Sequence, residues 1–104
     1  MSRSFVQGPL YRLGKAQQIS LATSSTQGTA FGAQTFAVRL ALLGVSATTQ
    51  VVYRIGDGSQ TSTLSTDSAL PDHWVETVLV SPSQNIAVIA NTAGGTLSVT
   101  ELVQ

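Results

Sequence analysis

His73 is the only histidine of the chain, so a Ser–His–Asp triad would have to use it, with Asp57, Asp67 or Asp72 orienting the ring. Serine is so frequent here that its presence near His73 would carry no information, and no Gly-x-Ser-x-Gly motif is present. His73 stands between Asp72 and Trp74, where a loop is expected to lead into a strand, which is an ordinary place for a surface histidine. We therefore predict no catalytic residue and no enzymatic activity.

Metal and cofactor sites are equally poorly supported by the sequence. One histidine and no cysteine exclude the usual zinc ligand sets. Asp57-Gly58-Ser59 matches the start of a calcium loop, but the later acidic positions and the closing Glu are missing, so a turn explains it better. Gly94-Gly95 is followed by neither a lysine nor a helix start, as a phosphate loop requires. We predict no metal and no cofactor.

Two aromatic residues offer another kind of site. Trp74 and Tyr53 could form a platform on which a sugar ring stacks. The competing interpretation places them in the core or in a subunit contact, because aromatic side chains bury a large area in both settings. A carbohydrate-binding β-module is therefore kept as an alternative function.

The composition indicates a small domain with few charges. The chain has 104 residues, is 42% hydrophobic and 10% charged, and has a net charge of zero. This excludes a typical nucleic-acid binder, which needs an excess of Lys and Arg, and it does not suit a disordered chain. No apolar run reaches the roughly 20 residues of a membrane helix, and no signal peptide is visible. We expect a soluble chain made in the cytoplasm, without disulfides.

The uncharged polar residues suggest what the surface is for. Ser and Thr make up 26 of the 104 residues, and such a surface costs little to desolvate. This favours a subunit of a protein assembly, because interface cores are depleted in charge. The alternative is an extracytoplasmic β-domain with a polar surface. All five basic residues lie within residues 1–54 and all five acidic residues within 57–101, which predicts complementary patches between copies unless folding brings the halves together.

Residues 1–14 are predicted to form an extended arm ahead of a β-sandwich domain at 15–104. Gly8-Pro9 and Gly14 interrupt regular structure, yet the segment is too apolar for a free tail. One interpretation is that the arm docks on a neighbouring subunit, and the other is that it packs on its own domain. The residues predicted to make protein contacts are Phe5, Val6, Leu10, Tyr11, Arg12 and Leu13.

The remaining sequence reads as short β-strands separated by turns. Ala33–Leu43 gives the clearest pattern, since its apolar and small or polar residues alternate with the period of two of a half-buried strand. Further strands are predicted at Lys15–Thr23, Gln50–Ile55 and Trp74–Val80, with a short edge strand around Leu64. We expect an all-β fold, either a single β-sandwich (jelly-roll-like) or a partly closed barrel, of six to eight antiparallel strands.

The C-terminal third carries the strongest local signal. Ile86–Ile89 and Leu97–Val99 flank the turn-forming stretch Asn91–Gly95, which predicts a β-hairpin. The predicted core consists of Ile19, Leu21, Phe36, Val38, Leu40, Leu42, Val51, Tyr53, Ile55, Val78, Val80, Ile86, Val88, Leu97 and Val99.

Three phrases stand out in residues 36–102 and just before them: TFAVRLAL, VVYRIGDG and LPDHWVETVLVSPSQNIAVIANTAGGTLSVTEL. In these phrases the sequence resembles small structural proteins of tailed bacteriophage virions. The resemblance implies a non-enzymatic virion protein, most similar to a capsid decoration or cement subunit on the outer head surface. It also implies homo-oligomers, with a homotrimer favoured, and contacts with the major capsid protein. Head–tail junction, tail and fibre-base roles remain alternatives within this class.

Overall fold

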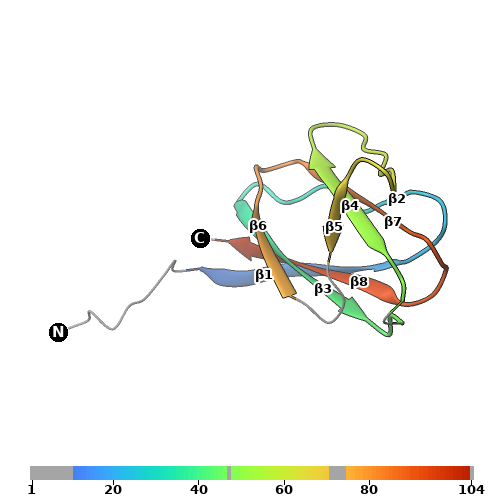
Figure 1. Ribbon diagram of the computed structural model, residues 1–104. Helices are drawn as coiled ribbons and strands as arrows, with labels where there is room; N and C mark the ends of the chain where they lie inside the picture. Colours follow the sequence, from blue (N-terminus) through green and yellow to red (C-terminus); the bar gives the residue numbers. More distant parts are fainter. Residues whose placement is uncertain (1–10, 47, 71–74, 104) are drawn as a thin grey trace.

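The computed structural model describes residues 11–46, 48–70 and 75–103, which form eight strands and no helix. Sheet A contains, in spatial order, β1 (Arg12–Ser20), β8 (Thr96–Val103), β3 (Thr35–Leu43) and β6 (Val75–Leu79). Sheet B contains β2 (Thr26–Gln27), β7 (Asn85–Ala90), β4 (Val51–Gly56) and β5 (Ser68–Leu70). Both sheets are antiparallel and lie against each other without closing into a barrel (Figure 1). The all-β prediction is confirmed, in its sandwich form.

The core lies between the two sheets and is built from alternate residues of their strands. In β3, Val38 and Leu40 are fully buried, while the intervening Arg39 faces the other side of the sheet. Most predicted core residues belong to the buried cluster, and Leu42, Ile55, Val78 and Val80 pack against its margin. The cluster also contains residues that the sequence did not single out, namely Phe31, Leu70 and Ala90.

Phe36 is a wrong core prediction, and a break in strand register explains it. The pairing of β3 with β8 shifts between Thr35 and Ala37, which leaves Phe36 at a β-bulge. A bulge interrupts the alternation of side chains along a strand, so a period-two pattern cannot be extended through it. Phe36 is half-buried and lies outside the core cluster, whereas the neighbouring Thr35 is buried.

The predicted C-terminal hairpin is also wrong, although both of its strands exist. β7 pairs with β2 and β4 in sheet B, whereas β8 pairs with β1 and β3 in sheet A. The connection therefore crosses from one sheet to the other. Gly94 and Gly95, with φ values of 122° and 84°, adopt backbone conformations that favour glycine, and Leu21 exchanges backbone hydrogen bonds with them. Both β7 and β8 thus lie between two other strands of their own sheets and do not pair with each other.

Gly95 is also constrained by its surroundings. A Cβ atom at this position would lie 2.6 Å from Val45 Cγ2 and 2.9 Å from the carbonyl oxygen of Gly44. The connection between β7 and β8 therefore packs directly against the turn that follows β3.

Two element boundaries differ from the predictions. Residues 12–14, assigned to the arm, form the start of β1, while residues 1–10 lie outside the described residues. The short edge strand is centred on Ala69 in β5 and not on Leu64, which lies in a turn. That turn is fixed because the backbone N–H groups of Thr66 and Asp67 both donate to the carbonyl oxygen of Thr63.

Candidate protein-contact surface

The outer face of sheet B is covered by the chain itself. Val52 of β4 and Ala87 of β7 alternate with core residues and so face outward, yet their exposed fractions are 1% and 0%. The 57–67 loop covers them: Ser62 is buried, its hydroxyl donates to the carbonyl oxygen of Val52 at 3.3 Å, and its N–H donates to Ser25 Oγ at 2.8 Å. On this face Ile89 is half-buried and Ala69 is exposed, but no large hydrophobic side chain is exposed among the described residues.

Sheet A differs in that its outer face carries large hydrophobic side chains that are exposed, although Leu102 and Ala37 on this face are buried. The large hydrophobic residues that are exposed in the described part of the chain all lie on this sheet or immediately before it: Tyr11, Leu13, Leu43, Val75 and Leu79. Leu79 is 81% exposed and Leu13 is 60% exposed. Exposed apolar side chains gathered on one face indicate an interaction surface more strongly than scattered ones do. We call the outward-facing residues of β1, β8, β3 and β6 the outer face of sheet A.

Strand register arranges this face in rows. Leu13 pairs with Leu102, Leu102 with Ala37, and Ala37 with Leu79, so an apolar row crosses the sheet from β1 to β6. Its ends, Leu13 and Leu79, are exposed, whereas Leu102 and Ala37 in its middle are buried. The next row contains Arg39 between Thr100 and Thr77. The face therefore has exposed apolar side chains on both sides of a middle row of two threonines and one arginine.

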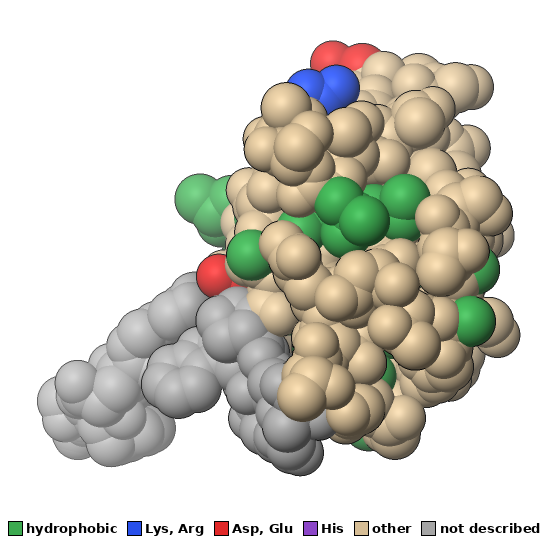
Figure 2. Space-filling view, turned by 45° about the vertical axis from the view of Figure 1, so that its right-hand side comes forward, with side chains coloured by type: hydrophobic (Ala, Val, Ile, Leu, Met, Phe, Trp, Pro, Cys, Tyr) green, Lys and Arg blue, Asp and Glu red, His purple; other side chains and the backbone are tan. Residues whose placement is uncertain are grey.

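The rest of the visible surface is nearly uncharged. In Figure 2 most of the exposed atoms are uncharged polar side chains or backbone, and charged groups occupy small areas. Arg54 Nε lies 3.3 Å from Asp67 Oδ1, which joins the basic N-terminal half to the acidic C-terminal half within one chain. The sequence suggested that basic and acidic residues pair between copies, but Arg54 and Asp67 pair within one copy.

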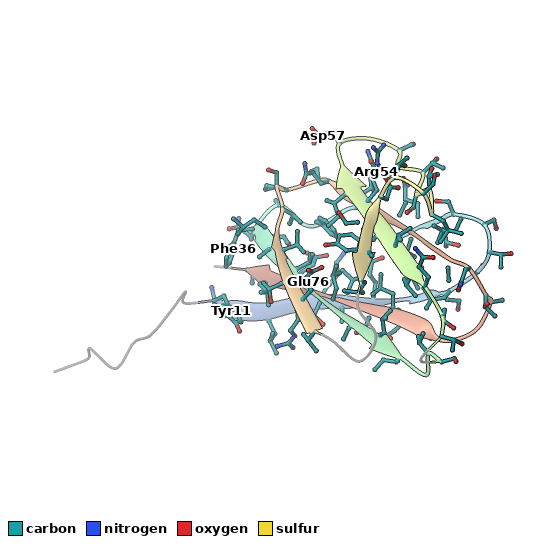
Figure 3. The ribbon with its side chains drawn as sticks, viewed as in Figure 1. Tyr11, Phe36, Arg54, Asp57 and Glu76 are labelled. Carbon is teal, nitrogen blue, oxygen red and sulfur yellow. The ribbon has the colours of Figure 1, made fainter. Side chains whose placement is uncertain are left out.

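Only part of the predicted contact set can be placed. Phe5, Val6 and Leu10 lie outside the described residues. Tyr11, Arg12 and Leu13 are exposed at the start of β1. Figure 3 shows Tyr11 at the end of the sandwich where β1 begins and β8 ends. The structure thus places this predicted group beside the apolar row that ends at Leu79.

Tyr53 and Glu76 join the two sheets near the open side of the sandwich. The Tyr53 hydroxyl donates to Glu76 Oε1 at 2.7 Å, which connects β4 of sheet B to β6 of sheet A. Desolvation by burial, followed by the hydrogen bond and the negative charge of Glu76, raises the pKa of Tyr53 well above its usual value. Tyr53 is 8% exposed and belongs to the core, so it does not offer an open ring face for sugar stacking.

Glu101 is a buried carboxylate with a structural explanation. It is 4% exposed, and its Oε1 atom accepts hydrogen bonds from the Gly32 N–H at 3.0 Å and from the Thr35 hydroxyl. These bonds hold the segment before β3 against the end of β8. Burying a carboxylate is costly unless it is hydrogen-bonded, and these donors meet that need.

A groove of about 500 Å³ lies between the edges of the two sheets. Its lining consists of Tyr53, Arg54, Ile55, Thr66, Asp67, Ser68, Val78, Leu79 and Gln84. The Thr63 N–H donates to Asp67 Oδ2 at 2.7 Å, and this bond is the main reason why the pKa of Asp67 lies below its usual value. Arg54 and Asp67 therefore form an ion pair with each other, and Asp67 also accepts a hydrogen bond from the loop. Neither member of this pair is left to bind a ligand charge in the groove.

Of the histidine and the aspartates considered for catalysis, the structure describes only Asp57 and Asp67. Asp57 is exposed in the turn after β4, and Asp67 is bound to Arg54 and Thr63. Asp72, His73 and Trp74 lie outside the described residues. Within the described ranges, no group of three or more His, Cys, Asp or Glu side chains could hold a metal ion, and no helix is long and apolar enough to cross a membrane.

Comparison of the chain with protein-family models, with curated proteins and with solved structures finds no match. The phage resemblance therefore stays a prediction from sequence phrases.

Sequence reasoning missed the contribution of β6 to the surface. Val75 and Leu79 occupy the same face of β6, and the alternation with Glu76 and Val78 is visible in the sequence VETVL. This pattern predicted a strand, and it correctly placed Val78 toward the core. It could not show that β6 lies at a sheet edge, because the order of strands in a sheet depends on contacts between distant segments of the chain.

Proposed function

We propose that this protein is a non-enzymatic structural subunit of a virion, acting as a decoration or cement protein on the outer surface of a bacteriophage head. The observation that carries the assembly role is the asymmetry between the two outer faces. Sheet B is covered by the chain's own loop, whereas sheet A exposes Leu13, Leu43, Val75 and Leu79. The phage context comes from the sequence resemblance alone.

The physical chemistry of the surface is consistent with this role. A subunit that bridges neighbouring capsid proteins works through many weak contacts that add through avidity. Ser, Thr and small apolar residues lose little favourable hydration when they are covered. In this proposal the major capsid protein contacts the outer face of sheet A, and residues 1–10 with Tyr11, Arg12 and Leu13 extend the contact from the start of β1. The oligomer expected from the resemblance is a homotrimer.

The proposal is tested by binding to heads that lack the protein. We expect Leu13→Lys and Leu43→Lys each to reduce attachment at least about tenfold, because each places a charge in an apolar contact. Thr61→Lys is the matched control, since Thr61 is exposed on the loop over sheet B. Normal attachment of both leucine variants, or equal loss with the control, would refute the proposed surface. Circular dichroism would verify that each variant keeps its β-structure.

Other virion positions are separated from the head surface by copy number. A decoration protein is present in many copies over the head, whereas a head–tail junction, tail or fibre-base component forms a single small ring or a stack on the tail axis. Quantitative mass spectrometry of purified particles would distinguish them.

A carbohydrate-binding β-module remains the second candidate, because the groove between β4, β5 and β6 has the size of a small-ligand site. Glycan-array binding that is lost in Ser68→Tyr, which would fill the groove, would favour this function. The Trp74→Ala variant tests the aromatic residue suggested by the sequence.

A further inference from the structure

The free edge of β6 has a regular geometry that follows from its pairing with β3. The Val80 N–H donates to the carbonyl oxygen of Phe36 at 2.9 Å, and the register then runs from Leu79–Ala37 to Val75–Ala41. Antiparallel pairs alternate between hydrogen-bonded and non-hydrogen-bonded. Val80 points its backbone groups toward β3, so Val75, Thr77 and Leu79 point theirs toward the free edge.

β6 has only part of the usual protection of an edge strand: it is five residues long, and its one charge, Glu76, points inward and accepts a hydrogen bond from Tyr53. Its sequence, VETVL, contains no Lys, Pro or Gly, and its register with β3 is free of bulges. Among the described residues, no strand pairs with its outer edge. An edge strand with β-branched residues and without Pro, Lys or a bulge is a template for pairing with another strand.

The residues that point their backbone groups outward are related by a local symmetry about Thr77. In an antiparallel pair of two β6 strands centred there, Val75 of one copy lies opposite Leu79 of the other, and Thr77 lies opposite Thr77. Val75 and Leu79 are 56% and 81% exposed, and the pairing brings each of them beside the other in the partner copy. Every outward N–H and C=O of the three residues then finds a partner.

The two Glu76 carboxylates, which lie on the inner face of the sheet, do not oppose this pairing. Glu76 of each copy faces Val78 of the other, so the two Glu76 carboxylates are diagonal neighbours and not directly opposite. Each also keeps the hydroxyl of its own Tyr53 at 2.7 Å. Like charges directly opposite each other destabilise a sheet, and the Thr77-centred register avoids that placement.

We propose that two copies of this chain associate through β6, in antiparallel register centred on Thr77, so that the two A sheets become one continuous sheet. The contact is isologous, because the same surface of each copy meets the other across a two-fold axis. It does not depend on the capsid role. It also differs from the homotrimer implied by the resemblance, which would need a separate surface.

Single cysteines test the register directly, since the natural chain contains none. Hydrogen-bonded antiparallel partners have Cα atoms about 5.5 Å apart, within the range of a disulfide. Thr77→Cys should therefore form a covalent dimer under mild oxidation. In Val75→Cys, the two cysteines of a pair are offset by four residues, roughly 14 Å along the strand, so cross-linking should be at least about tenfold slower.

Val75→Cys is a matched control because it lies on the same strand and the same face as Thr77. Equal rates for the two variants, faster linking of Val75→Cys, or no linking of Thr77→Cys would overturn the proposal.

A second variant tests the pairing in solution without cysteines. Thr77→Pro removes only an outward N–H, which the β3 ladder does not use, so the fold should persist. Sedimentation velocity of the natural chain should show concentration-dependent association that Thr77→Pro loses, with unchanged circular dichroism. Association of Thr77→Pro equal to that of the natural chain, or a natural chain that stays monomeric at all concentrations, would refute the contact. Neither result affects the test with Leu13→Lys and Leu43→Lys, so the two proposals fail separately.

Discussion

Tyr53→Phe removes one atom from the contact that joins the two sheets, and its effect can be worked out from the structure. The variant keeps the buried ring in the core and deletes the hydroxyl that donates to Glu76 Oε1 at 2.7 Å. A hydrogen bond to a charged group contributes about 1.5–3 kcal/mol, and the lower end applies because Glu76 is only partly buried. We expect a loss of about 1.5 kcal/mol in the free energy of unfolding, which lowers Tm by roughly 6–12 °C in a domain of this size.

The pH dependence gives this prediction a second readout. The pKa of Tyr53 is raised in the folded state, so its contribution is fully present below the unfolded value of about 10 and is lost as pH rises toward the folded value. The natural chain should therefore lose stability above pH 10 more steeply than Tyr53→Phe does.

Urea unfolding followed by circular dichroism at pH 7 and at several values above pH 10 measures both effects. Tyr11→Phe is the matched control, because Tyr11 is 44% exposed, and its stability should stay within about 0.5 kcal/mol of the natural chain. If Tyr53→Phe is as stable as Tyr11→Phe, or if its alkaline slope equals that of the natural chain, the assigned role of this contact is wrong.

Three further predictions concern the turns and the loop. Gly95→Ala should lower the free energy of unfolding by at least about 3 kcal/mol, because the added Cβ meets backbone atoms and φ is 84°. Gly58→Ala should lower it by about 1 kcal/mol, because Gly58 has φ 70° but open space around it. Equal Tm losses in thermal melts of the two variants would contradict this prediction. Asp67→Asn should lower Tm at pH 7, because a lowered carboxyl pKa stabilises the fold above the unfolded value. The Tm difference should shrink as pH falls below that unfolded value, and a pH-independent difference would contradict the pairing with Thr63 and Arg54. Ser83→Gly should raise stability by about 0.5–1 kcal/mol, because Ser83 has φ 69° after Pro82 in the turn before β7; a lower urea midpoint would refute this.

The strands themselves were predictable because their signal is local. In β3 and β4 the alternation of apolar and other residues placed the strands and most of their core residues correctly. Alternation failed at Phe36, where the partner strand imposes a bulge that only the pairing of β3 with β8 can reveal.

Strand pairing was less accessible, since it depends on contacts between distant segments. The turn residues Asn91–Gly95 fit a hairpin locally, but β7 and β8 each pair with two other strands in opposite sheets. The same limit applies to the candidate surface. The sequence indicated Tyr11 and Leu13 through their apolar character, whereas the exposure of Leu79 follows from the edge position of β6.

In the proposed function, neighbouring proteins of the particle contact the outer face of sheet A. A cryo-electron microscopy map of the purified particle tests it most directly. We predict β-sandwich density in many copies on the head exterior, with the exposed Leu13 and Leu79 against the shell or a neighbouring copy. A sandwich whose sheet A faces solvent while sheet B makes the contacts, or a head without this density, would contradict the account.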